Sequence, residues 1–109
     1  MEILFQTSKS AKLFSSLNEL RRRFGDKNAK KIQLRMGALE SAETLSDYRK
    51  YDLRCHELSA DRAGQIAVDL VHPSRLVFEP KPPVSCKPDG GYDWDRITSI
   101  IIIEVVDYH

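Results

Sequence analysis

The sequence lacks several patterns that would indicate a common chemistry. Its two cysteines, Cys55 and Cys86, form no CxxC pair, and the three histidines are not spaced with them as zinc ligands are. Gly90 and Gly91 belong to neither a GxGxxG nor a GxxxxGK[ST] phosphate loop, and no GxSxG motif marks an acyl-transfer serine. We therefore expect reduced thiols and no metal or cofactor, and we exclude the common nucleotide-binding and serine-hydrolase classes.

Long hydrophobic runs are also missing. The longest, around residues 100–106, is far shorter than the roughly 20 residues of a membrane-spanning helix, and the chain does not open with a basic segment followed by an apolar one. Hydrophobic residues make up 41% and charged residues 30% of the 109 positions, as in ordinary globular proteins. We expect one domain over residues 1–109, in the cytoplasm and without a membrane partner.

The formal net charge is only +1, which is too small to mark a nucleic-acid-binding protein by composition. Basic residues nevertheless crowd the first third of the chain, and most acidic residues follow later. The basic residues of the first third are Lys9, Lys12, Arg21, Arg22, Arg23, Lys27, Lys30, Lys31 and Arg35. Two interpretations have similar weight: these side chains contact RNA, or they form the solvent faces of amphipathic helices.

The N-terminal half has the pattern of a strand followed by two helices. Residues 2–6 are mostly apolar and favour a short strand, and hydroxyl residues that can cap a helix follow directly. Apolar residues then recur at helical spacing up to Gly25, a residue typical of a helix C-cap, which predicts a helix over residues 8–24. A second helix, capped by Asp26, is predicted to end near Glu43, so the two form a helical hairpin.

The C-terminal half changes to the alternating pattern of strands. A polar stretch over residues 44–52 leaves room for a short helical turn, and apolar and polar residues alternate after it. Strands are predicted near residues 53–58, over 66–70, over 74–80 and over 100–106. The fold class is therefore α+β, with the N-terminal strand and the helical hairpin packed on an antiparallel sheet.

Residues 81–97 form a loop insertion rich in proline and glycine. It is longer than most connections between strands. We expect a surface excursion that is held to the domain by Trp94 and Ile97.

Acid, base and cationic groups are scattered around the later strands. They are His56, Arg75, Asp107, Tyr108 and His109. Imidazoles titrate near neutral pH, so two of them beside a carboxylate can share general-base and general-acid roles in cleaving a phosphodiester. An arginine would stabilise charge on the phosphoryl oxygens. Judged by spacing alone, a structural role for these residues is the commoner outcome.

Two segments of the chain resemble a known family. They are RCHELSADRAGQIAVDLVHPSRLVFEP and the terminal VVDYH, which are similar to the HigB-type toxins of the RelE/ParE superfamily, also called plasmid-maintenance killer proteins. The family pattern has a strand histidine, a KGD-R-G turn, an alternating strand, an R-aliphatic-x-F strand and a closing DYH. Here Ser59 and Ala60 replace the usual Lys-Gly, RLVF supplies the arginine strand, and DYH is complete.

The resemblance implies a RelE/ParE-like fold and an mRNA endoribonuclease that acts on translating ribosomes, through attack by the 2′-OH and without a metal. Matched by position, the implied catalytic residues are His56, Arg75, Asp107, Tyr108 and His109. The arginines Arg54 and Arg62, which flank His56 in the sequence, join Lys30 and Lys31 as candidates for RNA contact. The resemblance does not decide which group acts as general base and which as general acid.

The family also implies partners. We expect a cognate HigA-like helix-turn-helix antitoxin that covers the active site or packs on the helices, and operator DNA that is reached only through that antitoxin. Two alternatives belong to other functional classes. One is a ParE-like toxin that binds DNA gyrase and cleaves no RNA, and the other is an inactive binding module that acts as a co-repressor.

Overall fold

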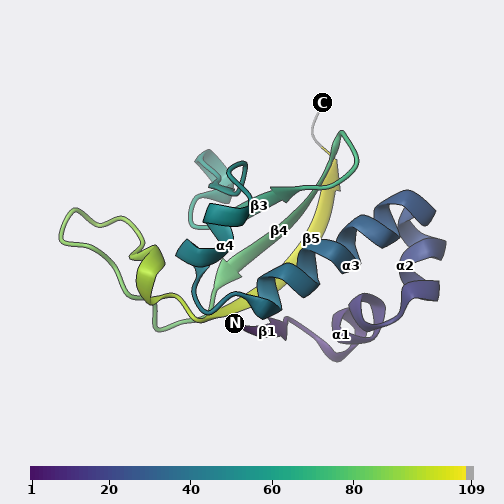
Figure 1. Ribbon diagram of the computed structural model, residues 1–109, viewed down its shortest axis with the longest axis horizontal. Helices are drawn as coiled ribbons and strands as arrows, with labels where there is room; N and C mark the ends of the chain where they lie inside the picture. Colours follow the sequence, from purple (N-terminus) through teal and green to yellow (C-terminus); the bar gives the residue numbers. More distant parts are fainter. Residues whose placement is uncertain (108–109) are drawn as a thin grey trace.

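The computed structural model describes residues 1–107 and has an α+β fold, in which helices cover one face of a five-stranded sheet (Figure 1). The strands lie in the order β1-β5-β4-β3-β2. Their bounds are β1 Glu2–Phe5, β2 His56–Glu57, β3 Ile66–Asp69, β4 Ser74–Pro80 and β5 Ser99–Asp107. The α+β class is therefore confirmed. Strand β1 pairs parallel to β5 while the other pairs are antiparallel, so the complete sheet is mixed.

Four helices precede β2 along the chain. They are α1 (Ser8–Ser15), α2 (Leu17–Phe24), α3 (Asp26–Ser41) and α4 (Leu45–Tyr51). The prediction of one helix over residues 8–24 was wrong, because Ser16 leaves the helical conformation between α1 and α2. Its Oγ accepts a hydrogen bond from the backbone N–H of Glu19 at 3.2 Å. Ser16 and Glu19 have the spacing of a capping box, so a polar side chain starts a new helix there.

The turn between α2 and α3 depends on Gly25. Its φ is +84°, a value that glycine adopts without a Cβ penalty, and its backbone N–H donates to the Arg21 carbonyl at 2.9 Å. Asp26 is the first residue of α3 rather than its cap. There it pairs with the side chains of Arg21 and Lys30.

The core lies between the sheet and the helices. Alternate strand residues, among them Ile66, Val68, Leu76, Phe78, Ile100 and Ile102, are fully buried against residues of α1, α2, α3 and α4. Strands alternate in side-chain direction, so Ala67, Asp69, Arg75 and Val77 point to the opposite face. We call this opposite face of the sheet the outer face.

A β-bulge changes the register of the last strand. Val77 pairs with Glu104 and Phe78 with Ile102, which leaves Ile103 as the extra residue. Before the bulge Ile100 and Ile102 face the core, whereas after it Val105 packs against the core cluster. The bulge thereby turns Glu104 and Val106 to the outer face, and Val106 lies opposite Arg75.

Strand β2 is shorter than predicted. Residues 52–55 form a turn closed by the Cys55 N–H and the Asp52 carbonyl at 3.1 Å, so the ladder begins only at His56. The insertion at residues 81–97 holds the short 3₁₀ helix η2 (Trp94–Arg96). As predicted, Ile97 is buried and Trp94 packs against the core cluster.

Candidate functional site

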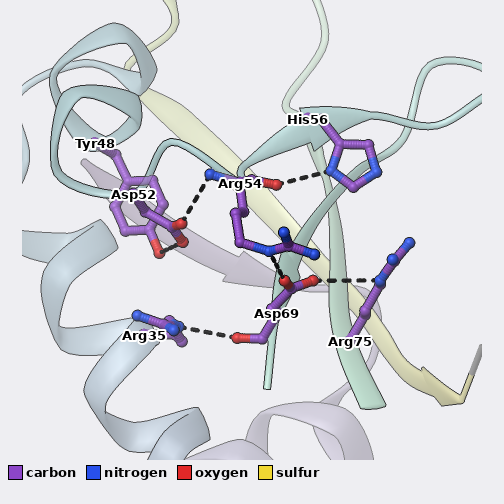
Figure 2. Close-up of polar contacts among 7 residues, drawn as sticks. All are labelled: Arg35, Tyr48, Asp52, Arg54, His56, Asp69 and Arg75. Carbon is purple, nitrogen blue, oxygen red and sulfur yellow. Dashed lines mark hydrogen bonds and ion pairs between the residues drawn. The ribbon is translucent and has the colours of Figure 1, made fainter. Parts of the chain in front are cut away.

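A carboxylate flanked by two arginines stands on the outer face, at the end of the β3–β4 hairpin (Figure 2). Asp69 ends β3 and pairs in register with Arg75 near the start of β4. Its Oδ1 lies 3.3 Å from Arg75 Nε, and its Oδ2 accepts a hydrogen bond from Arg54 Nε. The short hairpin places these residues opposite each other, because both strands continue directly from the turn.

His56 stands on β2 beside this pair of arginines. Its Nδ1 lies 2.8 Å from the backbone carbonyl oxygen of Arg54. A carbonyl oxygen only accepts, so this hydrogen bond places a proton on Nδ1. The neutral ring therefore has an unprotonated Nε2, which is able to take a proton from a bound molecule.

A chain of hydrogen bonds connects the site to the core. The buried hydroxyl of Tyr48 donates to Asp52 Oδ2 at 2.8 Å, and Asp52 Oδ1 accepts from the backbone N–H of Arg54 at 3.2 Å. From α3, the Nε of Arg35 donates to the backbone carbonyl of Asp69 at 3.0 Å. Figure 2 shows these contacts on the side of Arg54 and Asp69 that lies away from Arg75. The backbone of Arg54 and that of Asp69 are thus each held from the helical layer.

The surroundings of the site shift the pKa values of Asp69 and Tyr48. Partial burial acts to raise the pKa of Asp69, but the hydrogen bond and charge of Arg54, with the charges of Arg75 and His56, lower it overall. The carboxylate is therefore ionised at neutral pH. Burial, followed by the hydrogen bond to Asp52, raises the pKa of Tyr48 well above its ordinary value, so the phenol stays a neutral donor.

The insertion supports the strand that carries His56. Trp94 Nε1 donates to Glu57 Oε1 at 3.3 Å, and the Arg49 guanidinium of α4 lies 4.5 Å from the Trp94 ring centre. Farther along, the Tyr92 hydroxyl donates to the Gly64 carbonyl at 2.7 Å. Residues 81–97 therefore act as a brace for β2 and its connection to β3.

The turn between β2 and β3 contains a conformation that its residue type rarely takes. Ala60 begins the 3₁₀ helix η1 (Ala60–Arg62) with φ +58°, in the left-handed region. This is the position where the HigB-type pattern has glycine. The left-handed conformation, which a glycine adopts without strain, is therefore carried here by a residue with a Cβ.

The other residues predicted to contact RNA lie outside the cluster around Asp69. Arg62 donates to Gln65 Oε1 at 2.8 Å and to Glu104 Oε2 at 3.2 Å, so it crosses the outer face toward β5. Lys30 pairs with Asp26 on α3, and Lys31 is half-buried on the same helix. Within residues 1–107, no hydrogen bond or ion pair joins either lysine to the cluster around Asp69.

Asp107 stands apart from the arginine pair. It pairs in register with Ser74, whose Oγ donates to Asp107 Oδ1 at 2.7 Å. Ser74 Oγ also accepts from Asn28 Nδ2 of α3 at 3.2 Å, so this row of residues faces the helices. Because Arg75 is the next residue along β4, its side chain points to the opposite face. Tyr108 and His109 lie outside the described residues.

Sequence reasoning missed the residues that hold the site together, namely Asp69, Asp52, Tyr48 and Arg35. One signal for Asp69 was present. It is a charged residue within an alternating strand, and a tight hairpin centred on residues 71–73 would have paired it with Arg75. The Tyr48–Asp52 pair had the i, i+4 spacing of a helix but no sequence signal that tied it to the strands.

Within residues 1–107, no group of three or more histidine, cysteine, aspartate or glutamate residues is placed to hold a metal ion. In the same part of the chain, none of the helices has the length and apolar character needed to cross a membrane.

Comparison with known proteins reveals a likeness in structure but none in sequence. No protein-family model and no curated protein matches the sequence. The YoeB/ParE toxin from Agrobacterium tumefaciens has a similar structure, with a TM-score of 0.50, 17% sequence identity and coverage of 100% of both chains. This likeness confirms the RelE/ParE-like fold that the resemblance implied. The HigB-type assignment is finer than a likeness in fold and stays a prediction.

Proposed function

We propose that this protein is the toxin of a type II toxin–antitoxin pair and that it is an endoribonuclease, which cleaves mRNA on the ribosome and so inhibits translation. The observation that carries the proposal is the combination of His56, with an Nε2 able to accept a proton, and the neighbouring guanidinium groups of Arg54 and Arg75. A base beside two cations fits a phosphodiester substrate. The likeness in fold to a YoeB/ParE toxin supports the same class.

The mechanism needs only side-chain chemistry. Nε2 of His56 takes the proton from a ribose 2′-OH, and the 2′ oxygen attacks the adjacent phosphorus. The bond from phosphorus to the 5′ oxygen breaks, which leaves a 2′,3′-cyclic phosphate on one fragment and a 5′-OH on the other. The arginines stabilise the negative charge that develops on the phosphoryl oxygens.

A second group must give a proton to the departing 5′ oxygen. The resemblance offers Asp107, Tyr108 and His109. Since Asp107 is bound to Ser74 on the helix-covered face, we assign the acid role to Tyr108 or His109 and a strand-anchoring role to Asp107.

A groove on the helical side offers a place for the antitoxin. It has a volume of about 790 Å³ and lies between α1, α2 and the part of β5 that continues beyond its pairing with β1. Apolar lining residues are Leu13, Phe14, Phe24, Ile103 and Val105, and cations at the groove are Lys9, Lys12, Arg22 and Arg23. Four cations against Glu19 favour an acidic, amphipathic segment of the antitoxin, because the Glu104 side chain points to the outer face and pairs with Arg62.

The ParE-like alternative is supported by the structural neighbour, a YoeB/ParE toxin. A gyrase-binding toxin has no need of a base beside two arginines, which is why we place it second.

A reaction with purified components tests the proposal. Ribosomes programmed with a defined mRNA are incubated with the protein, and the products are examined for 2′,3′-cyclic phosphate ends. We expect cleavage of ribosome-bound mRNA by the wild type and none by His56→Gln. His72→Gln is the matched control, because His72 is an exposed histidine of the β3–β4 turn. Intact mRNA combined with inhibited gyrase supercoiling would instead establish the ParE-like alternative.

A further inference from the structure

Asp69 is the acidic side chain that lies between the two arginines of the candidate site, and the proposed reaction gives it no task. Among Arg54, Arg75 and Asp69, the charges add to +1. A carboxylate beside a phosphate site repels the ligand, so its position between the arginines calls for an explanation. Its two oxygens are divided between them: Oδ2 takes the Nε of Arg54, and Oδ1 lies 3.3 Å from the Nε of Arg75.

Stability is a poor explanation for the contact between Asp69 and Arg54. The Arg54 side chain is 74% exposed, and an ion pair made by so exposed a group is screened by water and adds little to folding. A long side chain held at one atom does, however, lose most of its freedom of movement. The contact with Arg54 therefore affects where its guanidinium group points more than it affects stability, whereas the pair with Arg75, whose side chains are 27% and 24% exposed, also contributes to folding.

The guanidinium atoms that contact Asp69 indicate which N–H groups of the arginines it engages. A guanidinium presents its donors along two edges, and phosphate oxygens are recognised by pairs of these N–H groups. Asp69 engages both arginines through Nε. The Nη atoms of Arg54 make no hydrogen bond with any residue in the range 1–107. In Figure 2 the guanidinium ends of both arginines extend beyond Asp69 on the side where His56 lies.

Asp69 is itself held in place. Its carbonyl accepts from Arg35 of α3, and the backbone of its partner Arg54 is bound to Asp52, which the buried Tyr48 holds. The orientation of the arginines is thereby traced to the core through successive hydrogen bonds. Such support for a charged group is what a preorganised binding site requires.

We propose that Asp69 is the positioning residue of a phosphate clamp, in which it aligns Arg54 and Arg75 on either side of the phosphodiester next to the 2′-OH that His56 deprotonates. The identity of the ligand rests on the proposed endoribonuclease function. The alignment of the arginines by Asp69 does not, and it is tested separately.

The first measurement uses the wild type alone. Nuclear magnetic resonance of the arginine side chains is expected to show slowly exchanging Nε–H signals for Arg54 and Arg75. The exposed Arg23, which has no ion pair within residues 1–107, supplies the reference. Asp69→Asn is expected to raise the exchange rates of both signals above their wild-type values, and that of Arg54 should approach the rate of Arg23. Signals of Arg54 and Arg75 that exchange as fast as that of Arg23 in the wild type would overturn the proposal, whatever the protein does to RNA.

The second measurement separates binding from reaction. Asp69→Asn removes a negative charge beside the phosphate, so the affinity for a single-stranded 2′-O-methyl oligonucleotide, which has no 2′-OH to react, should stay equal or rise. Cleavage of the matching RNA on ribosomes should fall at least tenfold in kcat, because the arginines are no longer aligned. Asp61→Asn makes the same charge change at an exposed residue of η1 and should leave kcat unchanged.

The outcomes are distinct for the two proposals. Equal kcat in Asp69→Asn and the wild type would refute the positioning role and leave the nuclease intact. A wild type that cleaves no RNA, yet binds the 2′-O-methyl oligonucleotide and shows the protected arginine signals, would refute the nuclease and support the clamp. Equal losses of kcat and of oligonucleotide affinity, with an unchanged thermal midpoint, would assign Asp69 a direct part in binding and contradict positioning.

Discussion

Replacement of Tyr48 by phenylalanine tests whether the site is anchored in the core. The side chain is 1% exposed, and its hydroxyl donates at 2.8 Å to Asp52. A hydrogen bond to a charged group contributes about 1.5 to 3 kcal/mol. Asp52 is half-buried and recovers part of this from water, so we expect a loss of about 2 kcal/mol in the free energy of unfolding. For 109 residues, this corresponds to a fall of about 9 °C in Tm.

Urea denaturation and thermal melting measure this loss, and Tyr51→Phe is the matched control. Tyr51 is 63% exposed and its ring contacts the ring of Tyr48, a contact that phenylalanine retains. Tyr51→Phe should change the free energy of unfolding by no more than about 0.5 kcal/mol. Equal stabilities of Tyr48→Phe and Tyr51→Phe would refute the anchoring of Asp52 and Arg54 through the core.

The pH dependence gives an independent check on the same hydroxyl. Because the pKa of Tyr48 is raised in the folded chain, the unfolded chain releases this proton first as the pH rises above its ordinary value of 10.0. The folded state then binds more protons than the unfolded state, so stability falls with rising pH. Tyr48→Phe lacks this contribution, and its difference in stability from the wild type should narrow above that pH.

Two further changes test the turn and the groove. Ala60→Gly should stabilise the chain by about 0.5 to 1 kcal/mol, since glycine removes the penalty of the left-handed conformation. The control Ala63→Gly, at a residue with φ −53°, should destabilise it. Urea denaturation measures both, and changes of the same sign in the free energy of unfolding would contradict the turn geometry. Lys12→Glu combined with Arg22→Glu should weaken capture of the helix-turn-helix antitoxin about tenfold without loss of toxicity, as measured by co-purification and growth. Lys27→Glu lies outside the groove and is the control, and equal capture by all forms would place the antitoxin elsewhere.

Hydrophobic pattern predicted most of the fold. Ile66, Val68, Leu76 and Phe78 alternate in the sequence and lie in the core, since one face of each strand is buried. The break between α1 and α2 was missed because the apolar spacing continues across Ser16, while the local cap overrides it. The hydrophobic pattern does not show whether neighbouring strands run parallel or antiparallel, so the parallel pairing of β1 with β5 could not be predicted from it.

The site was predictable only in part. The resemblance selected His56 and Arg75, which the structure brings to one face of the sheet beside Asp69. It also selected Asp107, whose side chain the strand alternation sends to the other face, where Ser74 binds it. Face assignment here depends on the bulge after Val77, and a bulge leaves no regular trace in hydrophobic periodicity.

Mapping the 5′ ends of cellular mRNA shows whether this protein cleaves translated messages and whether His56 is needed for it. The wild type, His56→Gln and His72→Gln are each expressed from a tightly controlled promoter, and new ends are located transcript by transcript. We expect new ends within translated regions for the wild type and His72→Gln, and none for His56→Gln. Growth arrest without new ends in any of the three, or the same ends in His56→Gln as in the wild type, would contradict this expectation.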